Sequence, residues 1–428
     1  MAVFVFCIAV FGMIFFSLYR PVLSVGTFSV SAYWLPPFFG ALFLLVSRTV
    51  SLSALLHALT ESNGMNPFKI LCLFLSMTAM SVVLDELGLF SYLASRLLHL
   101  AGNKQFRLFF SLYFLVSALT VFTSNDIVIL NFTPFIIYFS KNAGIDPVPY
   151  LFAEFVAANT WSMFLLIGNP TNIYISANLG IGFLEYLLHM ALPTVAAGLI
   201  SLGMLFLLFH RRLQSPIKVS PSTVRLRFVP LLIFGTLLLI ITTIALALSS
   251  YFPFAEMWQI SLAGALLLLI ALFAVTLTKK KTVIFLRAVN RLPFVLVPFL
   301  LSMFTLVFAL SQGTALLSLH AFFGRFPEAF YGFFSVLGAN IMNNIPMSIL
   351  FSSVLTAANT GSTAVYATVI GSNLGALFTP LGALAGIMWS GMLKNYNVRL
   401  SFLQFCKYGF SVAAPALLGA LLMLVLKI

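Results

Sequence analysis

Polar side chains interrupt a largely apolar chain at several places, and the first of these contains a carboxylate. Ser124, Asn125 and Asp126 break an otherwise apolar stretch from Phe106 to Phe139. An aspartate in hydrocarbon costs roughly 2.5–3.5 kcal/mol on insertion scales, so we expect a partner or a water-filled cavity beside it. Asp126 is therefore the candidate site for a coupling proton or cation. The alternative is a helix N-cap near the membrane surface, which the same residue types favour.

A second polar motif combines Asn159 and Thr160 with a run from Gly168 to Asn172. Because Gly tolerates unusual backbone angles and Pro lacks an N–H donor, we expect a helix to break near residues 168–170. Non-helical backbone survives at membrane depth only where protein buries it or a cavity adjoins it. The candidate ligands here are the freed backbone at Gly168, the amides of Asn169 and Asn172, and the Thr171 hydroxyl. An ordinary surface loop is the alternative.

Counterparts of both motifs occur in the second half of the chain. A shift of 214 residues, half of the total length, aligns Asn159 with Asn373, and a shift of 218 aligns Asp126 with Asn344. The alternative is chance similarity in apolar sequence. Internal repeats are common in secondary transporters, whose sites form where interrupted helices from both repeats meet. The candidate binding residues in this half are Asn340, Asn343, Asn344, Ser372, Asn373 and Thr379.

The elements that position these motifs must be membrane helices. Of the 428 residues, 61% are hydrophobic and only 7% are charged, which leaves too little polar surface for a water-soluble globule. A transmembrane barrel would show strands in which apolar and polar residues alternate, and the sequence lacks this pattern. We therefore predict an all-α polytopic membrane protein with re-entrant hairpins, discontinuous helices and about 10–12 membrane elements. The candidate elements are residues 3–19, 30–48, 68–84, 106–123, 127–140, 148–167, 186–209, 228–248, 257–278, 293–311, 330–356, 363–378 and 403–426.

Basic residues give the domain organisation and the orientation. The formal net charge is +13, and many of the basic side chains lie in two clusters, Arg211–Arg227 and Lys279–Arg291, separated by two strong spans. The positive-inside rule places both clusters in the cytoplasm, so the charge reflects topology and predicts no nucleic-acid partner. We predict a first repeat half at residues 1–210, a cytoplasmic linker at 211–227 and a second half at 228–428. The expected location is the inner membrane, with lipid as a partner.

The motifs resemble the arsenite permease and sodium-proton antiporter branch of the ion transporter superfamily, which also includes citrate and dicarboxylate carriers. The resemblance covers nearly the whole chain. It is carried by Asn125-Asp126 to Thr133-Pro134, Ile341 to Pro346, Val369 to Trp389 and Val83 to Gly88. It implies a homodimer of two-repeat protomers, each with a scaffold part and a moving transport part.

These observations predict a secondary transporter of a small ion or oxyanion, with arsenite or antimonite efflux as the substrate that the resemblance suggests. A sodium-proton antiporter and a citrate or dicarboxylate symporter are alternatives, and a passive channel is an alternative from another class. No His-Glu-x-x-His helix or other reactive constellation points to an enzyme. We expect no cofactor or metal, only H⁺ or Na⁺ as a coupling ion. Glu154 within a span is a weaker titratable candidate, and Asp85 and Glu86 fit a structural role.

Overall fold

The computed structural model describes residues 1–20, 22–25, 28–60, 66–102, 104–215, 217, 226–249, 255–358 and 360–427. The all-helical class is confirmed, with one small addition: an antiparallel hairpin in which β1 (Val22–Val25) pairs with β2 (Phe28–Ser31). The first half contains α1 (Ala2–Tyr19), α2 (Leu35–Val46), α3 (Leu52–Thr60), α4 (Pro67–Glu86), α5 (Leu89–Ala101), α6 (Gln105–Phe122), α7 (Asn125–Ala143), α8 (Val148–Trp161), η1 (Leu166–Gly168), α9 (Pro170–Asn178), α10 (Phe183–Phe209) and η2 (His210–Leu213). The second half contains α11 (Val229–Leu248), α12 (Met257–Thr278), α13 (Val283–Asn290), α14 (Leu296–Ser311), α15 (Ala315–Phe323), α16 (Phe330–Met342), α17 (Asn344–Ala358), α18 (Ser362–Gly375), α19 (Leu384–Asn395) and α20 (Phe402–Lys427).

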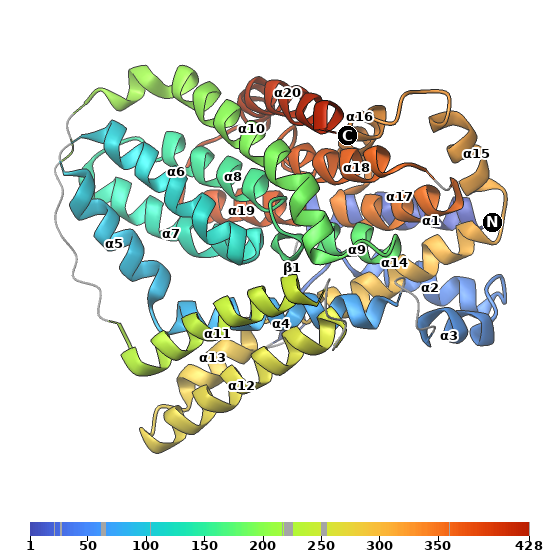
Figure 1. Ribbon diagram of the computed structural model, residues 1–428, viewed down its shortest axis with the longest axis horizontal. Helices are drawn as coiled ribbons and strands as arrows, with labels where there is room; N and C mark the ends of the chain where they lie inside the picture. The colour runs from blue at the N-terminus through green and yellow to red at the C-terminus, as the bar shows by residue number, and fades with distance from the viewer. Residues whose placement is uncertain are drawn as a thin grey trace.

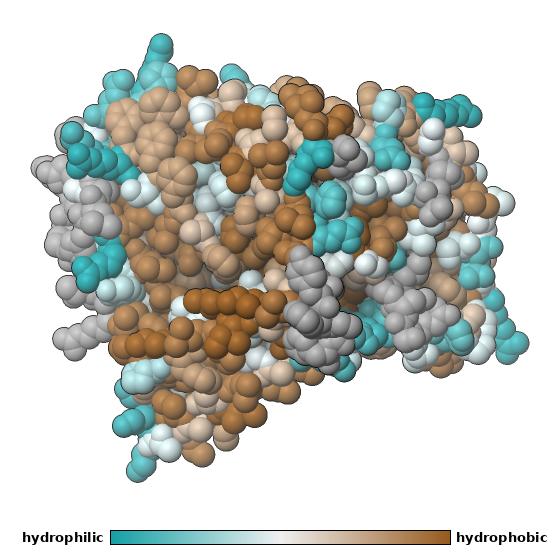
Figure 2. Space-filling view, viewed as in Figure 1, coloured by the Kyte–Doolittle hydropathy of each residue, from teal (hydrophilic) through white to brown (hydrophobic). Residues whose placement is uncertain are grey.

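Membrane-length helices alternate with shorter, broken ones. Within the described ranges, seven helices are long and apolar enough to cross a membrane: α1, α4, α6, α10 with η2, α11, α12 and α20. Large apolar side chains point outward from them, as at Ile233 of α11 and Ile270 of α12, which are 56% and 64% exposed. Apolar side chains accordingly cover much of the face in Figure 2. Because so much exposed hydrocarbon is unfavourable in water, lipid is the solvent for these faces.

Helices from the two halves of the chain pack against each other. The long helix α10 lies along α20, and α4 lies along α12 (Figure 1). Within the second half, α16 and α18 approach closely because Gly371 faces the backbone carbonyl of Gly332, where any Cβ would collide. Small residues permit such contacts between membrane helices. The shorter helices α8 and α18 lie in the interior, and almost all of their residues are buried.

Two expected helix breaks differ in position from the sequence prediction. The stretch 330–356, predicted as one element, is split into α16 and α17 at Asn343, whose φ of 73° and ψ of 152° lie in a region used almost only by glycine. In the first half, α8 already ends at Trp161, and the break continues through η1 to Asn169. Proline remains compatible with helix at its first position, which explains why α9 begins at Pro170.

The predicted linker at residues 211–227 lies mostly outside the described residues. Its described parts are Arg211 to Ser215, Ile217, Leu226 and Arg227. The division into halves therefore stays a prediction.

Candidate functional site

Asn373 of α18 joins the two halves of the chain in a buried hydrogen-bond network. Its Oδ1 accepts hydrogen bonds from Ser162 Oγ and Asn169 Nδ2, both at 2.9 Å. Its Nδ2 donates to Asn172 Oδ1 at 2.7 Å and to the Val369 carbonyl at 2.9 Å. All four contacts use the full donor and acceptor capacity of one amide. The break between α8 and α9 is therefore held in place by a residue about 200 positions further along the chain.

The network continues toward the start of α7. Asn125 Nδ2 donates to Asn159 Oδ1 at 3.2 Å, and the Ser162 hydroxyl also lies 2.9 Å from the Asn159 carbonyl oxygen. Asn125 and Asn159 are at most 1% exposed. The break also requires close backbone packing, because a Cβ at Gly168 would collide with the Ser162 carbonyl. The first two sequence motifs thus meet inside the protein, and neither is a surface loop.

The second-half motifs pair with one another. Asn340 Oδ1 accepts from the Thr379 hydroxyl at 2.7 Å, while Asn343 Nδ2 donates to the Leu381 carbonyl at 3.1 Å. The backbone N–H of Asn344 donates to Gly382 at 3.0 Å. These contacts close the turn between α18 and α19 onto the turn between α16 and α17. Helix α7 begins at Asn125 and α17 begins at Asn344, so the two helix starts correspond to each other. The sequence alignment, which paired Asp126 with Asn344, differs from this correspondence by one position.

A serine pair connects this second group to the Asn373 network. The hydroxyl groups of Ser348 and Ser372 lie 3.2 Å apart, and Ser348 also donates to the Asn344 carbonyl at 2.7 Å. Ser372 is the chain neighbour of Asn373. The second-half motifs and the Asn373 network therefore adjoin each other inside the protein.

Several buried oxygens in the first-half motifs have no hydrogen-bond partner among the described residues. They are Ser124 Oγ, Asn125 Oδ1, Thr160 Oγ1 and Thr171 Oγ1. Their side chains are at most 4% exposed. An unsatisfied buried polar group costs about 1–3 kcal/mol, so a bound ion, polar solute or water would be stabilised here. The motifs retain unused capacity to coordinate a ligand.

Asp126 faces a large cavity between the two halves. The cavity has a volume of about 830 Å³ and is bordered by Ser124 and Asp126 at the start of α7, by Thr78 of α4, and by Pro380 and Leu381 of the second-half turn. Asp126 is half-buried, and no ion pair or hydrogen bond joins it to another residue that the structure describes. Its carboxyl group is available to a cation or proton that enters this space.

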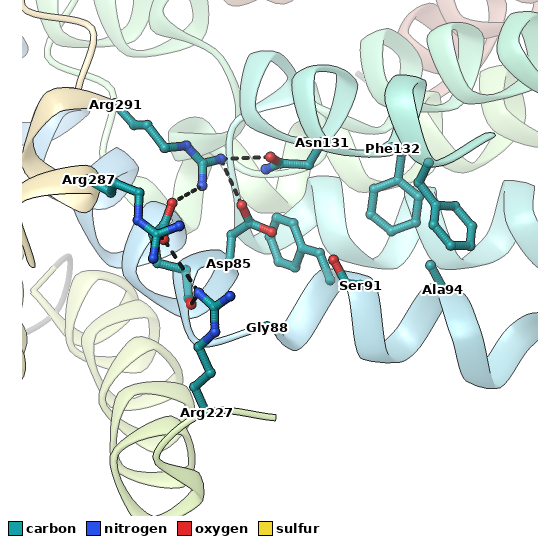
Figure 3. Close-up of a pocket in the computed structure, with 12 residues that line it drawn as sticks. Asp85, Gly88, Ser91, Ala94, Asn131, Phe132, Arg227, Arg287 and Arg291 are labelled. Atoms are coloured by element: carbon teal, nitrogen blue, oxygen red, sulfur yellow. Dashed lines mark hydrogen bonds and ion pairs between the residues drawn. The ribbon is translucent and has the colours of Figure 1, made fainter. Parts of the chain in front are cut away.

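An ionic cluster adjoins the cavity through Arg291. Arg291 lines both this cavity and a second one of about 270 Å³. Figure 3 shows its guanidinium group between Asp85 and Asn131; the distances are 2.7 Å to Asp85 and 2.6 Å to Asn131, and Glu86 lies at 2.8 Å. Burial alone would lower the pKa of Arg291, but the Asp85 and Glu86 carboxylates outweigh it and raise this pKa above its ordinary value. The cluster ties α4 and α7 to the residues after α13.

Sequence reasoning missed several residues that complete the site. Ser162 lies between the two quoted parts of the second motif, and its spacing of three from Asn159 on a helix was the available signal. Arg291 was included only in the basic cluster that indicates membrane orientation. Its acidic partners, Asp85 and Glu86, are about 200 residues away in the sequence, so no local signal connected them. Within the described part of the chain, no three His, Cys, Asp or Glu side chains gather as a metal site.

Comparison with known proteins agrees with this architecture. A family model of the CitMHS citrate transporters matches residues 32–367. The arsenical pump membrane protein of Yersinia enterocolitica is 28% identical over 385 residues, which cover 83% of this chain and 85% of that protein. The protein of the same name from Escherichia coli strain K12 matches with the same identity and coverage. The Alcanivorax borkumensis YdaH transporter has a similar fold, with a TM-score of 0.60 and 14% sequence identity over 99% of this chain and 98% of that one.

These similarities confirm the resemblance to the ion transporter superfamily that the asparagine motifs indicated. Together with the multi-span helical architecture, they identify a secondary transporter located in the inner membrane. The family model covers most of the chain, and the chain belongs to the CitMHS citrate transporter family.

Proposed function

We propose that this transporter exports arsenite or antimonite across the inner membrane, coupled to protons or sodium ions through Asp126. The observation that carries the proposal is the Asp126 carboxyl group, which has no ion-pair or hydrogen-bond partner among the described residues and faces a cavity of about 830 Å³. The adjoining residue, Asn125, begins the amide network that links both halves of the chain. The names of the relatives from Yersinia enterocolitica and Escherichia coli support the choice of substrate.

The chemistry of the cavity lining also favours this substrate. Arsenite and antimonite are uncharged trihydroxides at neutral pH, so hydroxyl and amide groups suffice to bind them. Citrate carries several carboxylates, which proteins usually hold with more than one arginine or lysine. The cationic groups on this cavity are Lys394 and Arg291, among the residues that the structure describes, and Arg291 is already paired with two carboxylates.

The position of Arg291 supports access from the cytoplasm. Arg291 ends the second basic cluster, which the positive-inside rule places on the cytoplasmic side, and it borders the cavity. The elements α1–α10 are followed by elements of similar order in α11–α20, which supports the two-repeat organisation. We extend the proposal to a homodimer in which a transport part containing these motifs moves against a scaffold part.

Two other transport activities are alternatives to this proposal. The family description names a citrate transporter, so a citrate or dicarboxylate symporter is one alternative. A sodium-proton antiporter would use Asp126 for both ions in turn. A passive channel would give flux that neither saturates nor follows the coupling gradient.

Purified protein in proteoliposomes distinguishes these functions. Arsenite, antimonite, sodium with an internal pH probe, citrate and succinate are tested one at a time under imposed proton and sodium gradients. We expect saturable, gradient-dependent arsenite or antimonite flux, which the Asp126→Asn variant loses. The control is Asp146→Asn, because Asp146 lies at an exposed ion pair with Arg212. Unchanged flux and ion dependence in Asp126→Asn would remove Asp126 from the mechanism, and flux of citrate alone would reassign the substrate.

A further inference from the structure

Glu154 of α8 is a buried carboxyl group that the transport scheme above does not use. Its side chain is 0% exposed. No lysine, arginine or histidine in the described ranges approaches it as an ion-pair partner. Because an uncompensated carboxylate is strongly disfavoured at membrane depth, a neutral carboxylic acid fits this environment far better.

The contact with Thr133 of α7 is consistent with a carboxylic acid. The Thr133 hydroxyl oxygen lies 3.0 Å from both Glu154 carboxyl oxygens. A threonine hydroxyl has a single hydrogen, so an ionised carboxylate could only share it between its two oxygens as a weaker bifurcated hydrogen bond. If the carboxyl group carries a proton, one oxygen accepts from Thr133 and the other donates to it. A protonated Glu154 therefore satisfies both contacts with full hydrogen bonds.

The second half of the chain closes this site. The Trp389 ring of α19 packs against Phe155, the neighbour of Glu154, with ring centroids 4.9 Å apart. Its indole N–H approaches the Glu154 carboxyl group but does not reach hydrogen-bonding geometry with any described residue. Helix α19 also lines the Asp126 cavity through residues such as Leu384 and Met388. A movement of α19 would thus change both the cavity and the cover over Glu154.

Other titratable groups on the surrounding helices are engaged elsewhere or lie near the surface. Tyrosines with other partners are Tyr113 of α6, Tyr150 of α8, Tyr186 of α10, Tyr366 of α18 and Tyr408 of α20. Exposed or half-buried groups are Arg107, Asp126, Tyr138, Lys141, Glu185, His189, Lys394, Tyr396, Cys406, Lys407 and Lys427. Of these, Asp126 has the closest structural relation to Glu154, because it shares α7 with Thr133.

Asp126, Leu130 and Thr133 follow the spacing of one helix face. Positions four and seven residues apart lie above one another, and seven residues correspond to roughly 10 Å along the axis. Asp126 and Leu130 line the cavity, and Thr133 contacts Glu154. Pro134 lacks an N–H group, so the Leu130 carbonyl loses its usual helical donor between the two acids.

We infer that Glu154 is an internal proton-binding site of this transporter, which carries a proton in the present conformation and exchanges it during the transport cycle. The proton leaving the Glu154 carboxylic acid is taken up by the Asp126 carboxylate or by cavity water, so one carboxylate forms as another is neutralised. The remaining Glu154 carboxylate needs water, which displacement of Trp389 would admit. The inference rests on the proposed transport function only for the exchange step.

Infrared spectroscopy of the purified protein tests the protonated state without any transport assay. We expect a carboxylic-acid C=O stretch at neutral pH that persists in Asp126→Asn and in the surface control Glu185→Gln but is lost in Glu154→Gln. Thr133→Val should shift this band, because it removes the hydrogen-bond partner and retains the shape. A spectrum without the band in the unaltered protein, or with the same band in Glu154→Gln, overturns the inference.

Proteoliposomes then test the exchange step. Glu154→Gln should bind arsenite or antimonite in detergent like the unaltered protein but lose the dependence of flux on the pH gradient. An unchanged gradient dependence contradicts exchange at Glu154. If Thr133→Val folds and Glu154→Gln does not, the shifted band in Thr133→Val still decides protonation. Absence of arsenite and antimonite flux in every variant and in the unaltered protein refutes the proposed substrate and leaves the infrared result valid.

Discussion

Replacement of Asn373 by alanine tests whether the two halves depend on one another. The substitution removes four hydrogen bonds from a side chain that is 0% exposed. Two of the partner atoms, Asn169 Nδ2 and Asn172 Oδ1, then have no other hydrogen bond to a residue that the structure describes. Since each unsatisfied buried group costs about 1–3 kcal/mol, we expect a loss of about 2–6 kcal/mol in the free energy of unfolding.

Thermal unfolding of the purified variant in detergent provides the measurement. With roughly 1.5 °C per kcal/mol for a chain of this length, the apparent melting temperature should fall by about 3–9 °C. The matched control is Asn178→Ala, because Asn178 is an asparagine near the surface with one 3.3 Å hydrogen bond to Thr356. Because Asn178 is half-buried and loses this one hydrogen bond, its replacement should cost about 0.5–1.5 kcal/mol.

Substrate binding separates a structural role from a direct one. We expect Asn373→Ala to weaken arsenite or antimonite binding as well, because the α8–α9 break loses its anchor. If Asn373→Ala melts and binds like Asn178→Ala, the network does not organise the site, and the reasoning that joins the two halves there is wrong.

Three further substitutions have defined outcomes in the same unfolding assay. Arg291→Ala leaves the Asp85 carboxylate buried without an ion-pair partner among the described residues, while Glu86 keeps contacts of 4.0 and 3.8 Å with Arg227 and Arg287, so the substitution should cost about 3 kcal/mol. Arg212→Ala, at an exposed ion pair, should cost at most about 1 kcal/mol, and equal losses would contradict the ionic cluster. Gly168→Ala should destabilise by about 1–3 kcal/mol through collision with a backbone carbonyl, while Gly203→Ala, which meets open space in a helix, should be neutral or stabilising. Asn343→Gly should be more stable than Asn343→Ala, because only glycine adopts this backbone conformation without strain, and Asn343→Ala should also weaken substrate binding. Equivalent behaviour of the two Asn343 variants would argue against a strained break.

Local sequence was sufficient to show that the protein lies in a lipid bilayer and that its fold is all-helical. The length and hydropathy of segments such as Val229–Leu248 require a membrane helix whatever they pack against. Gly, Asn and Pro at 168–170 likewise indicated a break, because their effects on the backbone depend on the residue itself. The position of that break was less accurate: α8 ends at Trp161, where packing of Ser162 and Gly168 decides the chain path.

Only the tertiary structure assigned partners to the polar residues. The sequence marked Asn169 and Asn373 as candidates, but their direct contact depends on how the start of α9 packs against α18. It also could not show that Arg291 pairs with Asp85. The same limit applies to the two acids: Asp126 borders a cavity and Glu154 is sealed against Thr133. The hydropathy of a segment is set by its own consecutive residues. The protonation state of a buried acid is instead set by the groups around it, which folding brings from distant positions in the chain.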